Sequence, residues 1–210
     1  EIEKLGTYRG RTVTTAIGDN QASFLGAAGD EENTLLVNMG TGGQISVLSG
    51  QYFSGDGIEA RPFLNGKYLL AGASLCGGKA YALLEQFFRK IVKEATGQEQ
   101  PLYKVMEKMA RTGRDQNSER TESRKIKVET TFDGTRLNPE KNGSITQVYS
   151  ENFTPEDFCY GVLNGMSTEL HQMYMTIQKG TGIKIRHMLG SGNGLRKNPV
   201  LCEIIEDMFK

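Results

Sequence analysis

The sequence predicts a mixed α/β domain, with a mixed sheet and flanking helices. Two apolar, β-branched runs, 33–40 and 43–50, are short and bounded by glycine, as buried strands are. Two longer segments, 79–97 and 154–177, repeat apolar residues every three or four positions, as amphipathic helices do. Tight-turn signals between some of the strands indicate hairpins within the domain, rather than a regular alternation of one strand and one helix.

The first half of the chain is expected to supply most of the sheet. In order, the expected elements are strands at 12–19, 33–40, 43–50, 59–64 and 67–74, with a short helix that begins near Asp19. The Asn-Gly pair between the last two strands is the strongest short hairpin signal in the sequence. A Thr-Gly-Gly turn joins the second and third strands and predicts another hairpin.

The second half is expected to be mostly helical. One helix ends near Gly97, and another covers 102–111. The polar stretch 112–125 is expected to be an exposed excursion. A long helix opens after Thr154, which is a good cap and is followed by acidic residues in the first turn. The remaining expected elements are strands at 126–132, 144–150 and 185–190, a loop at 191–197 and a helix at 198–209.

Composition excludes several classes of protein. The chain has 210 residues, and 25 basic and 25 acidic side chains give a formal net charge of +0, which argues against a dedicated nucleic-acid surface. Its three cysteines have no metal-like spacing and are expected to be reduced thiols in a cytoplasmic protein. No apolar run approaches membrane-spanning length. With His171 and His187 as the only histidines, a His-rich metal site is excluded and a Ser-His-Asp triad is poorly supplied.

The two ends of the sequence predict an excised domain. The chain lacks a starting methionine and enters a strand almost at once, and its last helical pattern stops without a cap or a following element.

Three glycine-rich stretches follow or join strands: "NMGTGGQ", "LAGASLCGGKA" and "LGSGNGLRK". Each fails a known phosphate motif. Ala80 replaces the hydroxyl residue of a P-loop, and Leu195 occupies the last glycine position of a dinucleotide fingerprint. Glycine at a strand end still lets a phosphate approach backbone N–H groups, and Thr41 adds a hydroxyl donor. Taken singly, each stretch is more often an ordinary tight turn, whereas the three together favour a nucleotide site.

Asp19 adds a carboxylate where the first expected strand passes into a helix. Such a corner is a common place for a catalytic group, but acids also cap helices for structural reasons. Both roles stay open on the residues alone.

The order of "GDNQASFLGAAG", "NMGTGG", "LAGAS" and "GSGNGLRKNP" resembles the carboxy-terminal lobe of FGGY-family carbohydrate kinases, from about Thr12 onward. Within that family, the stretches "FDGTRLNPEKNGSITQVYSENFTPEDFCYGVLNGM" and "HMLGSGNGLRKN" look most like sedoheptulokinase. The resemblance implies a ribonuclease H-like (actin-like ATPase) fold over residues 1–210 as a single lobe, with the amino-terminal lobe of the same polypeptide absent.

The resemblance also implies site residues. Asp19 matches the catalytic base that takes the proton from the sugar hydroxyl, and Asn20 stands where many members place a glutamine that touches the sugar. Cys76 replaces a polar residue that some members point at ATP. The positions that match the ATP-binding residues are Gly40, Thr41, Gly42, Gly72, Gly190, Gly192 and Asn198.

The implied activity is ATP-dependent phosphorylation of a sugar hydroxyl, with ATP and Mg²⁺ as cofactors. Most sugar contacts and part of the magnesium and phosphate site would come from the absent lobe, so no metal ligand is assigned here and the fragment alone is expected to be inactive. The resemblance is compatible with a homodimer. Two alternatives are an actin-like ATPase that is not a sugar kinase and a non-catalytic relative that binds sugar or nucleotide.

Overall fold

A computed structural model of the chain describes residues 4–14, 16–29 and 31–210. Its internal contacts divide it into two compact units. The first contains the described residues up to Val37, together with Gln44–Ala73 and Met173–Gly190; the second contains Asn38–Gly43, Ser74–Gln172 and Ser191–Lys210. Within the described ranges, no helix is both long enough and apolar enough to cross a bilayer.

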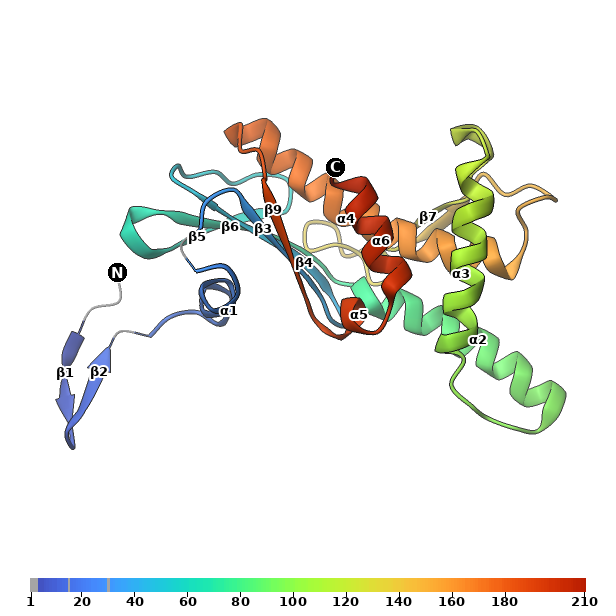
Figure 1. Cartoon of the computed structure of the whole chain (residues 1–210), viewed down its shortest axis with the longest axis horizontal. Coiled ribbons are helices and arrows are strands. Elements are labelled where there is room, and N and C mark those ends of the chain that lie inside the picture. The colour runs from blue at the N-terminus through green and yellow to red at the C-terminus, as the bar shows by residue number, and fades with distance from the viewer. Residues whose placement is uncertain (1–3, 15, 30) are drawn as a thin grey trace. The chain divides into compact units, whose positions relative to one another are not determined.

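A mixed five-stranded sheet with strand order β5-β6-β4-β3-β9 forms the first unit, as Figure 1 shows. Its strands are β3 (Thr34–Met39), β4 (Gly43–Ser49), β5 (Ile58–Pro62), β6 (Tyr68–Ser74) and β9 (His187–Ser191). The three inner strands are buried over nearly their whole length, and β3 and β6 are accordingly rich in apolar residues, while β4 also buries Ser46 and Ser49. Strand β5 lies at an edge of the sheet. Pro62 has no N–H to donate and is tolerated there, because an edge strand pairs with a neighbour on one side only.

Both predicted strand pairs are neighbours in this sheet. Strands β5 and β6 pair antiparallel from Ile58↔Gly72 to Pro62↔Tyr68. Between them, Asn65 and Gly66 have φ values of 57° and 70°, a left-handed conformation that asparagine and glycine tolerate best. The Asn-Gly hairpin is therefore confirmed.

Helix α1 (Asp19–Ala28) is also confirmed, with Gly18 as its N-cap. It packs through Phe24, which is fully buried with Leu36, Leu48, Phe63 and Leu69 in one hydrophobic cluster. The Phe24 and Phe63 rings meet edge to face, with centroids 5.9 Å apart. One large aromatic side chain thus anchors a helix that otherwise consists mostly of small residues.

The strand predicted over 12–19 is wrong in extent. Strand β2 (Arg11–Thr14) pairs with β1 (Lys4–Tyr8) in a separate two-stranded sheet, and residues 16–18 are not a strand. Thr15 lies outside the described residues. Every side chain of β2 is exposed. The β-branched residues of this segment therefore reflect a preference for strand conformation and do not indicate a buried strand.

Helices and one small sheet make up the second unit. Its elements are α2 (Gly77–Thr96), α3 (Tyr103–Ser118), β7 (Lys127–Glu129), β8 (Ser144–Thr146), the first part of α4 (Pro155–Thr181), α5 (Asn193–Arg196) and α6 (Pro199–Met208). Gly97 ends α2 with φ 71°, as predicted. Gly161 and Gly165 of α4 lie against Ile126 and Val128, so close that a side chain at Gly165 would strike the Val128 carbonyl.

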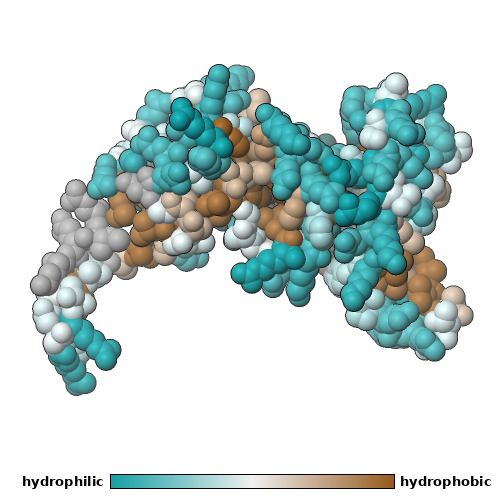
Figure 2. Space-filling view, viewed as in Figure 1, coloured by the Kyte–Doolittle hydropathy of each residue, from teal (hydrophilic) through white to brown (hydrophobic). Residues whose placement is uncertain are grey.

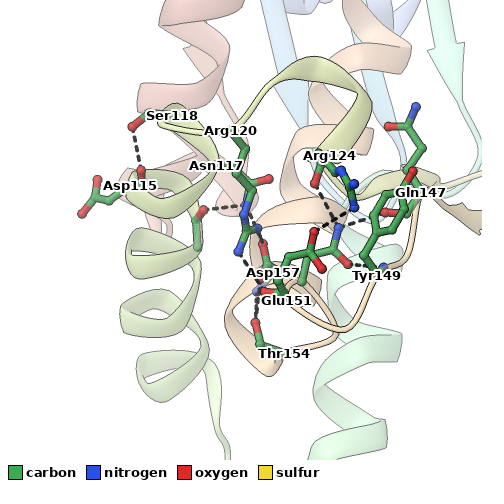
Figure 3. A network of polar contacts seen from close by, with 12 residues as sticks. Asp115, Asn117, Ser118, Arg120, Arg124, Gln147, Tyr149, Glu151, Thr154 and Asp157 are labelled. Atoms are coloured by element: carbon green, nitrogen blue, oxygen red, sulfur yellow. Dashed lines mark hydrogen bonds and ion pairs between the residues drawn. The ribbon is translucent and has the colours of Figure 1, made fainter.

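The prediction of an exposed excursion over 112–125 is wrong in part: most of these residues are exposed, but the stretch begins as helix and contains a buried polar contact. Helix α3 continues to Ser118, and Asn117 is fully buried. Its amide donates to a carboxylate oxygen of the buried Asp157 at 2.6 Å, and Arg120 forms an ion pair with the same carboxylate. Figure 3 shows these side chains converging on the start of α4, where the Thr154 hydroxyl also bonds to Asp157 at 2.8 Å. Two polar residues of this stretch, Asn117 and Arg120, are therefore partners of a buried acid.

Helix α2 exposes much of its apolar stripe. Leu83, Phe87 and Ile91 are 38%, 59% and 54% exposed. Figure 2 shows hydrophobic residues gathered over α2 at the lower right. The side of α2 that is buried carries Ala80, Tyr81 and Glu85 instead. Amphipathic spacing identified the helix correctly, but it did not identify the face that packs within this unit.

Candidate functional site

The glycine turn after β3 is bonded to the first turn of α2. The N–H groups of Gly78 and Lys79 donate to the carbonyl oxygens of Gly40 and Thr41, both at 3.0 Å. An added Cβ at Gly77 or Gly78 would collide with the backbone of this turn. Glycine is required at these positions because two backbone segments lie in direct contact. The glycines that sequence analysis associated with phosphate approach serve first to join the turn to the helix.

A cavity of about 610 Å³ opens beside this junction, entirely within the second unit. Helices α2, α3 and α4, the glycine turn and the segment around α5 all contribute to its wall. The lining residues are Gly40, Thr41, Gly78, Lys79, Tyr81, Ala82, Tyr103, Glu107, Leu163, Met166, Asn193, Gly194, Lys197, Asn198 and Leu201. This volume is in the range of small-molecule and cofactor pockets.

The wall formed by the glycine turn and the start of α2 is polar. Thr41 is exposed, and within the described ranges its hydroxyl has no hydrogen-bond partner. Lys79 adds a cation, and Lys197 adds a second one from the α5–α6 segment. A free hydroxyl, two ammonium groups and closely packed glycines form a surface that suits an anion.

The ammonium of Lys79 is paired with Asp133 at 2.7 Å. Their mutual hydrogen bond is the main reason why the pKa of Lys79 is raised and the pKa of Asp133 is lowered. Both side chains are about 40% exposed, so solvent screens the pair and the lysine stays accessible to another anion. Cys76 is buried nearby; burial, reinforced by Asp133, raises the pKa of its thiol to about 11.

The wall formed by α2, α3 and α4 is aromatic and apolar. The rings of Tyr81 and Tyr103 lie 6.3 Å apart at a 38° tilt, and Leu163 and Met166 of α4 complete this side. Tyr81 is 6% exposed, and its buried hydroxyl meets no hydrogen-bond partner among the described residues. Glu107 is half-buried on the same wall, and no described residue pairs with its carboxylate.

Burial strongly raises the pKa of Tyr81, so its hydroxyl stays protonated and can donate. The Asn198 amide lies near enough to oppose that shift, but it does not reach hydrogen-bond geometry with the hydroxyl. Asn198 itself is nearly buried, and its side-chain oxygen accepts the Leu201 N–H at 3.1 Å as the N-cap of α6. The predicted Asn198 therefore does line the cavity, with its oxygen already occupied.

The predicted glycines divide into two groups. Gly40 lines the cavity; Gly42 does not line it and lies against the Ser74 carbonyl. Gly192 has φ 93° and lies against the backbone of Met39, which places the α5 segment beside the glycine turn. The other two, Gly72 and Gly190, are strand residues of the first unit, in β6 and β9.

Gly72 does not line the cavity. It pairs with Ile58 in the sheet, and an added Cβ would lie 2.9 Å from atoms of Ile58 and Met173. Close packing against Ile58 and Met173 therefore explains the glycine at this position. The glycine that stands at the cavity on this side is Gly78, six residues later.

The two predicted substrate residues lie in the first unit, at the start of α1. Asp19 is exposed at the first helical position, and its carboxylate accepts the N–H of Asn20 at 2.7 Å. The side-chain oxygen of Asn20 accepts from Gln44 at 2.7 Å and from Ser46 at 3.4 Å, which ties α1 to β4. Since Gly18 is the N-cap, the carboxylate of Asp19 keeps acceptor capacity for another group.

Several cavity residues were not predicted from the sequence. Those with polar or ionisable side chains include Lys79, Tyr81, Tyr103, Glu107 and Lys197. Tyr103 and Glu107 stand four positions apart and so share a helix face, but nothing in the sequence indicates that this face meets α2.

Within residues 4–14, 16–29 and 31–210, no group of three or more His, Cys, Asp or Glu side chains could hold a metal ion.

The sequence matches no protein-family model and no curated protein. Solved structures do match. The chain has the actin-like ATPase fold of carbohydrate kinases. The xylulose kinase of Rhodospirillum rubrum aligns over 97% of this chain and 38% of its own, with a TM-score of 0.79 and 19% identity.

Two further structures agree in extent. A ligand-bound xylulose kinase from Lactobacillus acidophilus covers 95% of this chain and 38% of its own, with a TM-score of 0.73 and 17% identity. The glycerol kinase of Plasmodium falciparum, solved with ADP, covers 99% of this chain and 41% of its own, with a TM-score of 0.69 and 16% identity. The chain thus spans about two fifths of the proteins that it resembles.

Proposed function

We propose that this chain is the nucleotide-binding lobe of an ATP-dependent carbohydrate kinase. The observation that carries the proposal is the cavity beside the glycine turn, which combines an anion-suited wall with an aromatic and apolar wall. A nucleoside triphosphate has the same two halves, a polyanionic tail and a flat base. The fold shared with xylulose and glycerol kinases supports the same assignment.

The phosphate tail would lie on the wall that carries Gly40, Thr41 and Gly78. The free hydroxyl of Thr41 would donate to a phosphate oxygen, while Lys79 and Lys197 would offset its charge. Phosphoryl transfer depends mainly on such positioning and charge stabilisation. Gly42, Gly72, Gly190 and Gly192 do not line the cavity, and their proposed role in binding ATP rests on the resemblance alone.

Asp19 would act as the base. A sugar hydroxyl oxygen attacks the terminal phosphorus of ATP, ADP leaves, and the carboxylate accepts the hydroxyl proton. The exposed position of Asp19 supports this assignment, as does its match to the family's base. Asn20 would contact the sugar through its amide nitrogen, because its oxygen accepts from Gln44.

Mg²⁺ would be bound by the ATP phosphates and in part by groups of the amino-terminal lobe, as the resemblance implies. Most sugar contacts would likewise come from an amino-terminal lobe of the same polypeptide. We therefore expect the isolated 210-residue chain not to phosphorylate any sugar. A ketose such as sedoheptulose is the proposed substrate class, and the cytoplasm is the proposed location.

The test is a phosphorylation screen of the full-length protein across ketoses and polyols, with ADP release as the readout. Sugar-dependent ADP release that is strongest with a ketose would support the proposal. ATP hydrolysis that no sugar stimulates would instead indicate an actin-like ATPase of another kind. Absence of nucleotide binding in the full-length protein would indicate a non-catalytic relative and would contradict the proposal.

A further inference from the structure

The side chain of Asn20, in the first turn of α1, is held by two polar side chains of the neighbouring strand β4. Its oxygen accepts from the Gln44 amide at 2.7 Å and from the Ser46 hydroxyl at 3.4 Å. The same Gln44 nitrogen also donates to the Ser46 oxygen at 3.0 Å, so the three side chains form one connected group. Ser46 is buried, and the other two are half-buried, so water competes with these bonds less than it does at an exposed surface.

This group determines which atom of the Asn20 amide is left for another molecule. The oxygen is occupied by its two donors, whereas the nitrogen has no partner among the described residues and is not sealed from solvent. An amide nitrogen can bind any sugar oxygen, because hydroxyl, carbonyl and ring oxygens all accept. An amide oxygen in its place could bind only a hydroxyl.

We propose that Gln44 is a positioning residue of the sugar site, which keeps the Asn20 nitrogen turned toward the sugar. Gln44 does not need to touch the sugar, because it acts through Asn20. The Asp19 carboxylate accepts the Asn20 N–H at 2.7 Å, so a restraint on Asn20 extends to the neighbouring base. This inference rests on the proposed function and adds a residue of β4 to a site otherwise placed at the start of α1.

The attachment of α1 to the sheet does not depend on Gln44. Phe24 is fully buried in the hydrophobic cluster beneath the helix. The Gln21 amide also donates to the Pro62 carbonyl oxygen of β5, at 3.4 Å. Replacing Gln44 should therefore leave the helix in place and release only the Asn20 side chain.

The substitution Gln44→Met tests the positioning role, because methionine has a similar length and no donor. The assay uses the full-length protein with ATP and the ketose or polyol that the phosphorylation screen shows to be its best substrate. The KM for the sugar should rise by about 3- to 10-fold, the usual net value of one hydrogen bond. The KM for ATP should not change.

The matched control is Gln21→Met. It removes the other glutamine that joins the first turn of α1 to the sheet, and Gln21 is half-buried as Gln44 is. The two variants should lower the melting temperature to a similar, small extent, but Gln21→Met should keep the sugar KM of the parent protein. An equal rise of the sugar KM in both variants would indicate a general loosening of α1 and would overturn the assignment.

A double-mutant cycle with Asn20→Ala tests whether Gln44 acts through Asn20. In the Asn20→Ala background, Gln44→Met should change kcat/KM for the sugar by less than about 2-fold, because the side chain that it positions is gone. The same loss in both backgrounds would mean that Gln44 acts independently of Asn20, and the inference would be wrong.

The substitution Gln44→Glu tests the orientation of the amide. A carboxylate only accepts, so it would bind the Asn20 nitrogen and leave the amide oxygen facing the sugar. The sugar KM should then rise more than in Gln44→Met. The same substitution in the Asn20→Ala background measures the effect of the added charge alone. A parent-like sugar KM in Gln44→Glu would mean that the Asn20 nitrogen already faces the strand, which contradicts the inference.

The outcomes separate this inference from the proposed function. If the parent protein phosphorylates a sugar and Gln44→Met has the same sugar KM, the inference is wrong while the proposed function stands. If the parent protein phosphorylates no sugar in the screen, the proposed function fails and the inference fails with it.

Discussion

Replacing Thr41 by valine tests whether the hydroxyl on the polar wall of the cavity binds a phosphate group. Valine has almost the same shape as threonine but carries a methyl group in place of the hydroxyl. In the folded protein the hydroxyl is exposed and has no partner within the described ranges, so its removal breaks no internal bond. The melting temperature of Thr41→Val should therefore match that of the parent protein.

The effect on nucleotide binding should be large by comparison. A hydrogen bond to a charged phosphate oxygen is worth about 1–3 kcal/mol, which corresponds to about a 5- to 150-fold loss of affinity. Adenosine has no phosphates, so its binding should not change. The assay is calorimetric titration of the full-length protein with ATP, ADP and adenosine.

The control is Thr12→Val, an exposed threonine of β2 outside the cavity. It should change neither stability nor affinity. Unchanged ATP affinity in Thr41→Val would mean that the glycine turn is only a structural turn. An equal loss for adenosine would mean that the variant disturbs the cavity as a whole, and the reasoning about one donor would be refuted.

Three further predictions concern other parts of the chain. Asp19→Asn keeps the shape and an acceptor for the Asn20 N–H, so its melting temperature should hold while kcat falls by roughly 10²–10⁴-fold; parent-like turnover would remove Asp19 from the chemistry. Asp157→Asn leaves the partly buried Arg120 without its counter-charge and should lower the free energy of unfolding by about 3 kcal/mol, measured by urea titration. Glu151→Gln, which breaks an exposed pair, should cost less than about 0.5 kcal/mol, and equal costs would contradict the role of burial. Burial lowers the pKa of His171, so the unfolded chain binds the proton more readily and stability should fall as pH drops below about 6.5; His171→Phe should make that fall shallower in pH-dependent melting, and an unchanged slope would refute it.

The elements that the sequence predicted best are those whose pattern reports burial directly. Strands β3 and β6 are rich in apolar residues because they are buried over nearly their whole length, and Asn65-Gly66 can adopt the left-handed turn that a tight hairpin requires. The sequence missed the end of α3 because its polar residues have partners that are distant in the chain. Asn117 is forty residues from Asp157, and no local pattern connects them.

The residues of the candidate site were likewise predicted only in part. Thr41 and Asn198 were identified and do line the cavity, because glycine turns and helix caps leave local signals. Tyr81 and Glu107 were missed, because a tyrosine and a glutamate on two helices are ordinary residues until packing places them on one wall. The Gly72 assignment followed the spacing of a motif, while the structure places Gly78 at the cavity.

The junction between the glycine turn and α2 bears on how such a fold can diverge. It is made of main-chain hydrogen bonds at Gly78 and Lys79 and of backbone contact at Gly77. Main-chain atoms are common to all amino acids, so drift elsewhere in the sequence does not weaken this attachment as long as the glycines remain. Side chains on the wall can then be exchanged freely, each exchange altering what is bound without moving the wall. The fold of this chain is shared with solved structures at 16–19% identity, as a scaffold held together by main-chain contacts would allow.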